Sequence, residues 1–383
     1  MDPDFTGDFT VICCPDSFKG TATAREAAAA MAAGVRDAGA TAIEVPMADG
    51  GEGTAELLAG AWAGDGGARG VPIHHDVATV DAIGRPITAR WWEPAPGRAV
   101  LDLASASGLP AVADAPDPLG ASTRGTGEVI LDCLDHGATD ITVCLGGSAT
   151  TDGGAGLITA LGARILGARG LGTQGLGGAA LADATELDLS GLDPRARRAR
   201  WTLVLDVTTP PRDAPAVFGP QKGASPEQVR QLTDALLAWC RLCGVDTAEP
   251  GHGAAGATPV GITAIAGDVT IERGAPLLAR ATGLDAVLGG TALDGQADLV
   301  LTGEGAVDSQ SHVGKVVGWI VGHSSAPVHV IGGTVDEGAD VVKRAAGATA
   351  LPGPMDRTRE QLRRAAHDAT LRAARTAGRA RRS

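Results

Sequence analysis

Seven acidic residues and three lysines lie in glycine-rich loops of this chain, and together they could carry out phosphoryl transfer. Such a reaction needs cations around the phosphates, carboxylates for Mg²⁺, and a group that accepts the proton of the attacking hydroxyl. A single acid in such a loop is more often a helix cap or a solvated residue, so the hypothesis depends on the whole set. The acids are Asp16, Asp49, Glu52, Asp152, Asp206, Glu304 and Asp308, and the lysines are Lys19, Lys222 and Lys315.

Lysine is rare in this sequence, and its distribution is therefore informative. The chain has 28 arginines but four lysines, and only Lys343 resembles an ordinary surface residue. The other three lie in the glycine-flanked stretches DSFKG, GPQKG and VGK. Lysine is a compact point charge that suits a moving phosphoryl group. The alternative is that these three lysines simply remain on solvated loops.

The segment LGGSATTDGGAG, residues 145–156, is a candidate phosphate-binding loop. Glycines allow the backbone to approach a phosphate, and the helical pattern that follows would add the partial positive charge of a helix N-terminus. The candidate nucleotide- and phosphate-binding residues here are Gly146, Gly147, Ser148, Thr150, Gly153 and Gly154. The chain has no Walker A loop, because Val316 follows Gly314-Lys315, and no G-x-G-x-x-G follows a predicted strand.

Five apolar runs must position these residues, and each is followed by a loop that carries glycine and an acid. The runs span 10–14, 41–45, 141–145, 299–302 and 328–331. Apolar runs without alternation are typical of parallel strands that are covered on both faces. Repeated strand–loop–helix units predict a doubly wound α/β sheet, whose ligands bind at the carboxyl ends of the strands. We therefore expect all five loops at one edge of one sheet.

The length of the chain favours two domains, because single cores rarely exceed roughly 250–300 residues. Residues 76–104 have the pattern of short antiparallel strands joined by turns, and residues 183–290 mix a strand, a helix and glycine-rich loops. We predict a Rossmann-like, mostly parallel α/β domain with a smaller mixed α/β domain inserted in pieces. The expected bounds are 8–75, 118–175 and 291–355 for the first domain, and 76–117 and 176–290 for the second. The basic segment 356–383 is expected to start as a helix and end as a disordered tail.

Composition restricts the possible partners. The net charge of −13 disfavours nucleic acid. The sequence lacks an apolar run of the roughly 18–20 residues that a membrane helix needs, and it lacks a secretory signal. Six irregularly spaced cysteines indicate a reducing, cytoplasmic location. Cys240 and Cys243 could suggest a metal or redox site, but their surroundings have the periodicity of a core helix.

Eight motifs occur in a fixed order along residues 11–335: PDSFKG, PMADGGEGT, TRGTGEVIL, LGGSATTDGGAG, DVTTP, FGPQKGA, PGHGAAG and TGEGAVDSQSHVGK. In these motifs the chain resembles the bacterial glycerate kinases of the class I type. The resemblance implies a two-domain α/β protein with a cleft between its domains. It also implies phosphorylation of D-glycerate with ATP and Mg²⁺, in many members at the 2-hydroxyl. The segment after residue 355 has no counterpart in the motifs of that family.

Under this resemblance each candidate residue receives a working role. Lys19 and Lys222 would neutralise the transferred phosphoryl group or hold the substrate carboxylate, and Asp206 or Asp152 would accept the hydroxyl proton. Asp49 and Glu52 would hold Mg²⁺, directly or through water. The nucleotide would contact Glu304, Asp308 and Lys315 as well as the loop 145–156. The candidate substrate-binding residues are Asp16, Ser17, Ser105, Arg124 and Gln221, although Arg124 could equally be a surface arginine.

Several departures from the family pattern leave the substrate open. Thr151 and Thr209 stand where the family commonly has asparagine, and His252 stands where it has alanine. The connection 211–217 is shorter than usual, and Val317 replaces a proline. A kinase for a related hydroxy acid or polyol, or a catalytically silent metabolite-binding relative, therefore remains an alternative. We expect a small-molecule substrate and a nucleotide as partners, no nucleic acid or membrane, and a monomer or homodimer.

Overall fold

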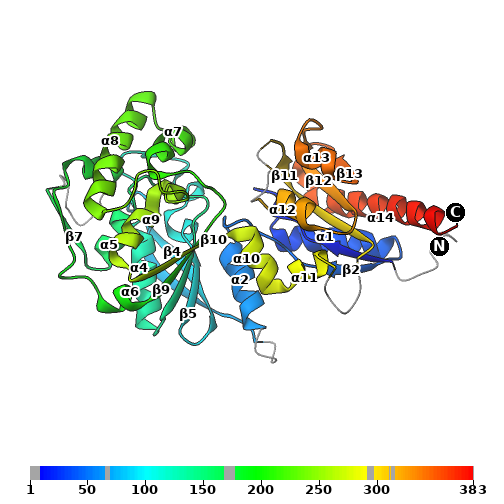
Figure 1. Ribbon diagram of the computed structural model, residues 1–383, viewed down its shortest axis with the longest axis horizontal. Helices are drawn as coiled ribbons and strands as arrows, with labels where there is room; N and C mark the ends of the chain where they lie inside the picture. Colours follow the sequence, from blue (N-terminus) through cyan, green and yellow to red (C-terminus); the bar gives the residue numbers. More distant parts are fainter. Residues whose placement is uncertain are drawn as a thin grey trace. The chain divides into compact units, whose positions relative to one another are not determined.

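The computed structural model describes residues 9–64, 70–167, 177–290, 297–309, 311 and 315–382, with residues 379–382 as backbone only. The chain divides into unit 1, Met1–Asp49 with Gly274–Ser383, and unit 2, Gly50–Arg273 (Figure 1). Each unit has its own sheet, and most strand pairs are parallel, which confirms the predicted α/β fold class. Parts of the predicted domains, at residue 8, 65–69, 168–176 and 291–296, lie outside the described residues, as do residues 310, 312–314 and 383.

Unit 1 contains a five-stranded sheet in which every neighbouring pair is parallel. The strands in order are β13 (Gly347–Ala350), β12 (Val328–Val335), β11 (Leu299–Val307), β1 (Thr10–Cys13) and β2 (Thr41–Glu44). Four of the five predicted apolar runs form strands here. The central strands β1 and β11 are buried, as expected for strands covered on both faces.

The helices of unit 1 pack on this sheet and on one another. Thr23 and Glu26 form a capping box at the start of α1, with Glu26 N–H donating to Thr23 Oγ1 over 3.2 Å and Thr23 N–H donating to Glu26 Oε2 over 3.0 Å. The helices are α1 (Ala24–Asp37), α10 (Gly274–Thr282), α11 (Leu284–Leu288), α12 (Val316–His323), α13 (Asp340–Arg344), the 3₁₀ turn η5 (Met355–Arg357) and α14 (Thr358–Arg382).

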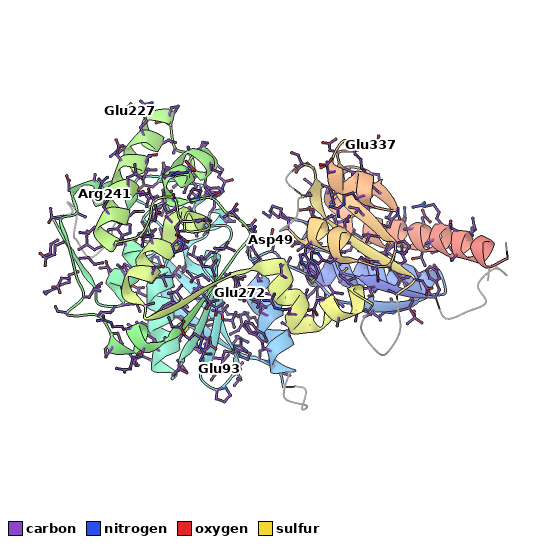
Figure 2. All side chains as sticks on the ribbon, in the orientation of Figure 1. Asp49, Glu93, Glu227, Arg241, Glu272 and Glu337 are labelled. Carbon is purple, nitrogen blue, oxygen red and sulfur yellow. The ribbon has the colours of Figure 1, made fainter. Side chains whose placement is uncertain are left out.

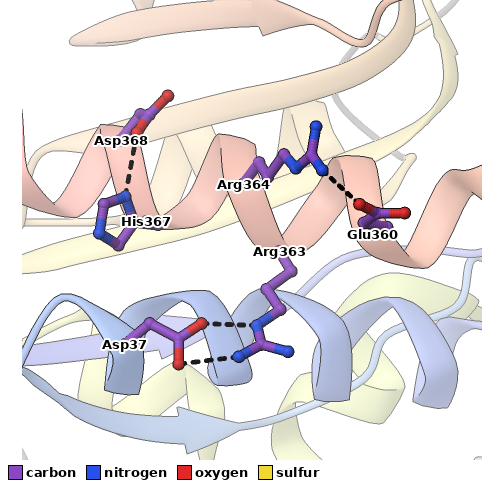
Figure 3. A pocket seen from close by; sticks show the side chains of 6 residues that line it. All are labelled: Asp37, Glu360, Arg363, Arg364, His367 and Asp368. Carbon is purple, nitrogen blue, oxygen red and sulfur yellow. Dashed lines mark hydrogen bonds and ion pairs between the residues drawn. The ribbon is translucent and has the colours of Figure 1, made fainter.

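The predicted disordered tail is wrong, because α14 continues to Arg382 and lies along α1 (Figure 1). Its apolar stripe of Leu362, Ala365, Ala366 and Ala369 is buried in the core of unit 1. At its surface, Arg363 Nε and Nη2 donate to the two carboxylate oxygens of Asp37 in α1, over 2.5 and 2.9 Å (Figure 3). The many arginines of this segment suggested a solvated tail, but those of α14 whose side chains the structure describes lie on the exposed face of an amphipathic helix.

Unit 2 contains a six-stranded mixed sheet. The strands in order are β10 (Asp268–Arg273), β9 (Arg200–Leu205), β6 (Asp140–Cys144), β5 (Arg98–Asp102), β4 (Pro86–Ala95) and β3 (Ile73–Val80). The first four are parallel, and β3, β4 and β5 form the antiparallel meander expected in 76–104. A separate two-stranded antiparallel sheet pairs β7 (Arg164–Leu166) with β8 (Glu186–Asp188).

The sheet to which β6 belongs differs from the predicted domain arrangement. The apolar run of β6 was expected in the same sheet as β1 and β11, but it pairs with β5 and β9 in unit 2. The meander therefore continues directly into parallel strands and does not belong to a separate inserted domain. An apolar run of five residues fits any covered parallel strand, so its composition cannot indicate which sheet it joins.

Unit 2 also contains most of the helices. They are α2 (Thr54–Ala63), α3 (Ala104–Ser107), α4 (Arg124–Asp135), α5 (Ala155–Ala160), α6 (Pro194–Arg198), α7 (Ala214–Phe218), α8 (Pro226–Cys243) and α9 (Ala254–Ile265), with 3₁₀ turns η1 (Pro110–Val112), η2 (Gly178–Asp183), η3 (Pro211–Asp213) and η4 (Pro220–Lys222). The connection 211–217, expected as a loop, forms η3 and most of α7. Within the described residues, no helix combines the length and apolarity that crossing a membrane requires.

The helix α8 confirms the structural interpretation of the CxxC pair. It starts at a capping box of Ser225 and Gln228, and its charged Glu227 and Arg241 lie in the first and last turns (Figure 2). Cys240 is buried in the core of unit 2, and both Cys240 and Cys243 are free thiols. The two cysteines belong to the packed face of the helix.

Two glycine substitutions test the contact between α1 and α14, and they should change the free energy of unfolding in opposite directions. A Cβ added at Gly34 would lie 2.0 Å from the carbonyl oxygen of Arg363, so Gly34→Ala should lower the free energy of unfolding by about 1–3 kcal/mol. Gly378 is also helical but has open space around it, so Gly378→Ala should raise the free energy of unfolding by up to about 1 kcal/mol. Urea unfolding measures both. Equal effects of the two substitutions would contradict the packing of α14 on α1.

Candidate functional site

Three neighbouring strands of unit 1 bring acidic residues to one edge of the sheet. Glu304 lies in β11, Asp16 follows β1, and Asp49 follows β2. The backbone keeps these segments in register beyond the strands, since Asp16 N–H donates to Gly303 O and Met47 N–H donates to Pro15 O, each over 2.9 Å. Because β11, β1 and β2 are adjacent and parallel, their carboxyl ends lie side by side, as the sequence predicted.

The charges in this acidic group are only partly balanced. Burial and the nearby charge of Asp49 raise the pKa of Asp16, and burial raises the pKa of Glu304. Lys315 Nζ lies 3.1 Å from Asp49 Oδ2 and provides a positive charge. Glu304 Oε1 is buried and has no hydrogen-bond partner among the described residues. One lysine facing three carboxylates leaves a negative site that a cation could balance.

These residues fit a magnesium ion that is bound together with a nucleotide. In the described part of the chain, no three His, Cys, Asp or Glu side chains are arranged as a ready metal site. Mg²⁺ usually keeps several waters and is held by one or two carboxylates and substrate phosphates, so it needs no preformed cage. Of the two predicted metal ligands, Asp49 belongs to unit 1, whereas Glu52 is an exposed residue of unit 2.

The remaining candidates of unit 1 lie near the same strand ends. Lys19 is exposed on a tight turn that is closed by a bridge between Phe18 and Ala22. Ser17 N–H donates to Asp16 Oδ1 over 2.5 Å, and Asp308 N–H donates to Ser311 Oγ over 3.1 Å. These contacts order the loops after β1 and β11.

The lysine of unit 2 occupies a buried polar site. Lys222 Nζ donates to Ser148 Oγ over 3.0 Å and to Thr150 O over 2.5 Å, although the lysine is only 3% exposed. Burial lowers the pKa of Lys222 to about 8, and the charge of Asp152 opposes this shift. Thr150 Oγ1 is buried and lacks a hydrogen-bond partner within the described residues. The structure thus joins Lys222, Ser148 and Thr150, and their role in phosphate binding stays a prediction.

Three glycines of the loop after β6, which the sequence predicted to bind phosphate, pack closely against other parts of the protein. A Cβ at Gly146 would lie 2.3 Å from the Cα of Gly51, one at Gly153 would lie 2.3 Å from the Trp239 ring, and one at Gly154 would lie 2.6 Å from Thr258 O. The N–H groups of these three glycines donate within the protein. Gly147 has more room, because a Cβ added there would lie 3.5 Å from the Cβ of Ala104. Gly146, Gly153 and Gly154 therefore have packing roles, and the part of these residues in phosphate binding stays a prediction.

Asp152 connects two helices. It is fully buried and accepts hydrogen bonds from Thr123 N–H (2.7 Å), Thr123 Oγ1 (2.8 Å), Gly154 N–H (3.2 Å) and Gly156 N–H (3.2 Å). Burial raises its pKa, and these donors oppose the rise. Its carboxylate thereby fixes the starts of α4 and α5. Asp206, the other candidate proton acceptor, follows β9 and is only partly buried.

Two candidate substrate-binding side chains are engaged inside the protein. Arg124 Nε donates to Glu128 Oε1 over 2.9 Å, and Ser105 Oγ accepts from Arg90 N–H over 2.7 Å. Gln221 is exposed on η4, directly before Lys222. The role of each in substrate binding stays a prediction.

Most residues that depart from the family pattern lie in unit 2, whereas Val317 lies in α12 of unit 1. Thr151 is buried, and Thr209 is partly buried and accepts from Gly253 N–H over 2.9 Å. His252 Nε2 lies 3.3 Å from Thr263 Oγ1, whereas His252 Nδ1 is buried and has no hydrogen-bond partner in the described residues. A buried ring nitrogen of this kind could bind a polar group of a ligand.

Sequence reasoning missed two charged residues at the same edge of the unit 2 sheet. Asp102 ends β5, and its oxygens accept from Gly53 N–H over 2.8 Å and Ala55 N–H over 3.0 Å. Arg273 ends β10, and its Nη1 donates to Asp206 O over 2.5 Å. Both residues stand directly at the end of a strand-like run, and this position in the sequence could have identified them as candidates. Asp102 was hidden because its strand belongs to the predicted antiparallel meander.

The pKa of Lys222 leads to a prediction on stability. An unfolded lysine holds its proton up to about pH 10.5, whereas folded Lys222 loses it near pH 8, so the unfolded state binds more protons between these values. This group therefore makes the free energy of unfolding rise from pH 8 to pH 10.5, by about 3 kcal/mol in total. Urea unfolding should show that rise in the wild type and not in Lys222→Met. The exposed Lys343→Met serves as control and should follow the wild type. A parallel pH dependence of wild type and Lys222→Met would contradict the buried charge.

Comparison with known proteins identifies the family of the chain. The sequence model of the glycerate kinase family matches residues 11–382, including α14 beyond the eight motifs. The chain is 36% identical to glycerate 2-kinase of Escherichia coli (strain K12) over 347 residues, and the match covers 87% of each chain. It is also 36% identical to glycerate kinase of Bacillus subtilis (strain 168) over 393 aligned residues, which cover 96% of this chain and 98% of the relative. A crystal structure assigned as glycerate kinase 2 from Salmonella typhimurium LT2 superposes with a TM-score of 0.76 at 34% identity, and the match covers 97% of this chain and 100% of that one. The chain belongs to the glycerate kinase family.

Proposed function

We propose that this kinase transfers the γ-phosphoryl group of ATP to the 2-hydroxyl of D-glycerate with the help of Mg²⁺. The observation that carries the proposal is the buried ammonium group of Lys222, held against Ser148 and Thr150 at the end of β6. A buried cation with an unused hydroxyl beside it suits an anionic phosphoryl group. The family of the chain and the name of its Escherichia coli relative support glycerate and the 2-hydroxyl.

Lys222 neutralises the charge that builds up on the transferred phosphoryl group. Its ammonium is oriented by Ser148 Oγ and Thr150 O, so little reorganisation is needed when the phosphate arrives. Thr150 Oγ1 donates to a phosphate oxygen and thereby gains the partner that it lacks among the described residues. Lys19, exposed on its tight turn, supplies a second positive charge for the phosphoryl group or the glycerate carboxylate.

Asp206 accepts the proton of the attacking hydroxyl. Asp206 is partly buried, and Arg273 Nη1 fixes its backbone carbonyl at the end of β9. Asp152 has a positioning role, because four donors surround its carboxylate and it holds the starts of α4 and α5. A proton acceptor needs an oxygen within hydrogen-bonding reach of the substrate, and this favours Asp206.

Mg²⁺, when bound, would neutralise phosphate charge and orient the nucleotide. Asp49 and Glu52 would hold it, while Lys315 pairs with Asp49 and keeps that carboxylate in place over 3.1 Å. Glu304 and Asp308 line the same edge of the unit 1 sheet and would contact the nucleotide. The cytoplasmic location, the oligomeric state and the position of the reaction in a cleft remain predictions.

A kinase for a related small hydroxy acid is the second candidate function. His252 Nδ1 favours it, because this buried nitrogen lacks a partner among the described residues and stands where the family commonly has alanine. A substrate with one more polar group than glycerate would satisfy it.

An acceptor screen tests the proposed function. Purified protein with ATP and Mg²⁺ should release ADP when D-glycerate is added, and ³¹P NMR of the product should show 2-phosphoglycerate. A 3-phosphoglycerate signal would contradict the proposed hydroxyl. Turnover of another hydroxy acid without turnover of glycerate would establish the second candidate instead.

The proton-accepting role predicts a large effect of one isosteric substitution. Asp206→Asn should lower kcat by roughly 10²–10⁴-fold, because the amide cannot accept the hydroxyl proton. The matched control is Asp234→Asn, an exposed acid on α8, which should keep wild-type kcat. Steady-state kinetics at saturating glycerate and ATP measures both. A kcat within threefold of wild type for Asp206→Asn would exclude it as the proton acceptor.

A further inference from the structure

The loop that carries Glu52 has little internal order of its own. Three of its four residues at 50–53 are glycine, and Gly50 and Gly53 have positive φ angles of 112° and 88°. Glu52 itself is exposed. Glycine has more conformational freedom than other residues, so the direction of the Glu52 side chain depends on the contacts of its neighbours.

Two sets of contacts hold this loop, one on each side of Glu52. Before it, Gly50 N–H donates to Thr54 Oγ1 over 3.2 Å, and Gly50 O accepts from Gly146 N–H over 2.9 Å. After it, Gly53 N–H donates to Asp102 Oδ2 over 2.8 Å. The same carboxylate accepts from Ala55 N–H in the first turn of α2 through Oδ1, over 3.0 Å. Each side is thus tied to the edge of the unit 2 sheet.

Asp102 is a rigid point of attachment. It is the last residue of β5 and pairs in register with Cys144 of β6, directly before the loop that carries Ser148. The N-cap residue of α2 is Gly53, whose lack of a side chain leaves the cap to another part of the chain. A carboxylate at a helix N-terminus also interacts favourably with the helix dipole. A serine or aspartate at position 53 would cap α2 as well, but it would not tie the loop to the sheet.

We propose that Asp102 is the positioning residue that fixes Glu52 for binding of the divalent cation. Asp102 acts through the Gly53 and Ala55 N–H groups and does not itself contact the metal or the substrate. The inference rests on the proposed function, in which Glu52 is a metal ligand. The inference gives a role to Asp102, for which the sequence predicted none. It also explains why a glycine-rich loop can present a carboxylate in one direction.

The test compares metal binding in Asp102→Asn, Glu52→Gln and the double variant. Asparagine keeps the size of the side chain but replaces one acceptor oxygen by a donor, so one of the two backbone N–H groups loses its partner. Mn²⁺ is titrated in the presence of ADP and followed by electron paramagnetic resonance. Asp102→Asn should weaken Mn²⁺ binding about five- to tenfold, the size expected for loss of a cap, and Glu52→Gln should weaken it at least as much because a metal ligand is lost. The double variant should bind no more weakly than Glu52→Gln alone, because both changes remove one interaction.

Asp193→Asn is the matched control. Asp193 caps α6 through Arg195 N–H over 2.8 Å, and it belongs to a segment without a predicted role in the site. This variant should bind Mn²⁺ as the wild type does. Thermal unfolding of all variants separates a loss of folding from a loss of metal affinity.

Each outcome decides the inference. If Asp102→Asn lowers the unfolding temperature and leaves Mn²⁺ affinity unchanged, Asp102 only caps α2 and the inference is wrong. Additive losses in the double variant would also overturn it, because Asp102 would then act independently of Glu52. If Glu52→Gln binds Mn²⁺ normally while the wild type phosphorylates glycerate, the metal role of Glu52 fails and the inference fails with it. If the wild type does not phosphorylate glycerate but the two losses are non-additive, the proposed function fails and the inference stands.

Discussion

Lys222 keeps a positive charge inside unit 2, and much of the surrounding architecture serves to hold it there. Its ammonium has Ser148 Oγ and Thr150 O as acceptors, and burial lowers its pKa to about 8. A buried charge is tolerated only with such partners. They come from the loop after β6, whose shape depends in turn on Gly153 and Gly154 packing against α8 and α9. The packing of α8 and α9 against this loop thus helps to set the position of the lysine.

The acidic group of unit 1 shows the complementary situation. Asp16, Asp49 and Glu304 come from three adjacent parallel strands, and their mutual repulsion is only partly relieved by Lys315. Strand ends in a parallel sheet bring such side chains together, and burial with the neighbouring charge of Asp49 raises the pKa of Asp16. A bound cation would relieve this repulsion, which is why the group suits Mg²⁺ with a nucleotide.

Local features were predicted well from the sequence. The apolar runs of β1, β2, β11 and β12 have short-range causes, and the structure has each of these strands. Predictions that needed long-range information were less successful. The apolar run of β6 was assigned to the wrong sheet, and the arginines of α14 concealed a stripe of small apolar residues that packs on α1.

The sequence by itself determined which residues are available for chemistry: the acids, the rare lysines and the glycine-rich loops of a glycerate kinase. The tertiary structure decided which of these residues contact one another. It placed Lys222 against Ser148 and Thr150, surrounded Asp152 with donors, and connected Asp102 to the loop of Glu52. The reason is physical: residue types and local spacing are written along the chain. The partners of a buried carboxylate or ammonium come from segments far away in sequence, which only packing brings together.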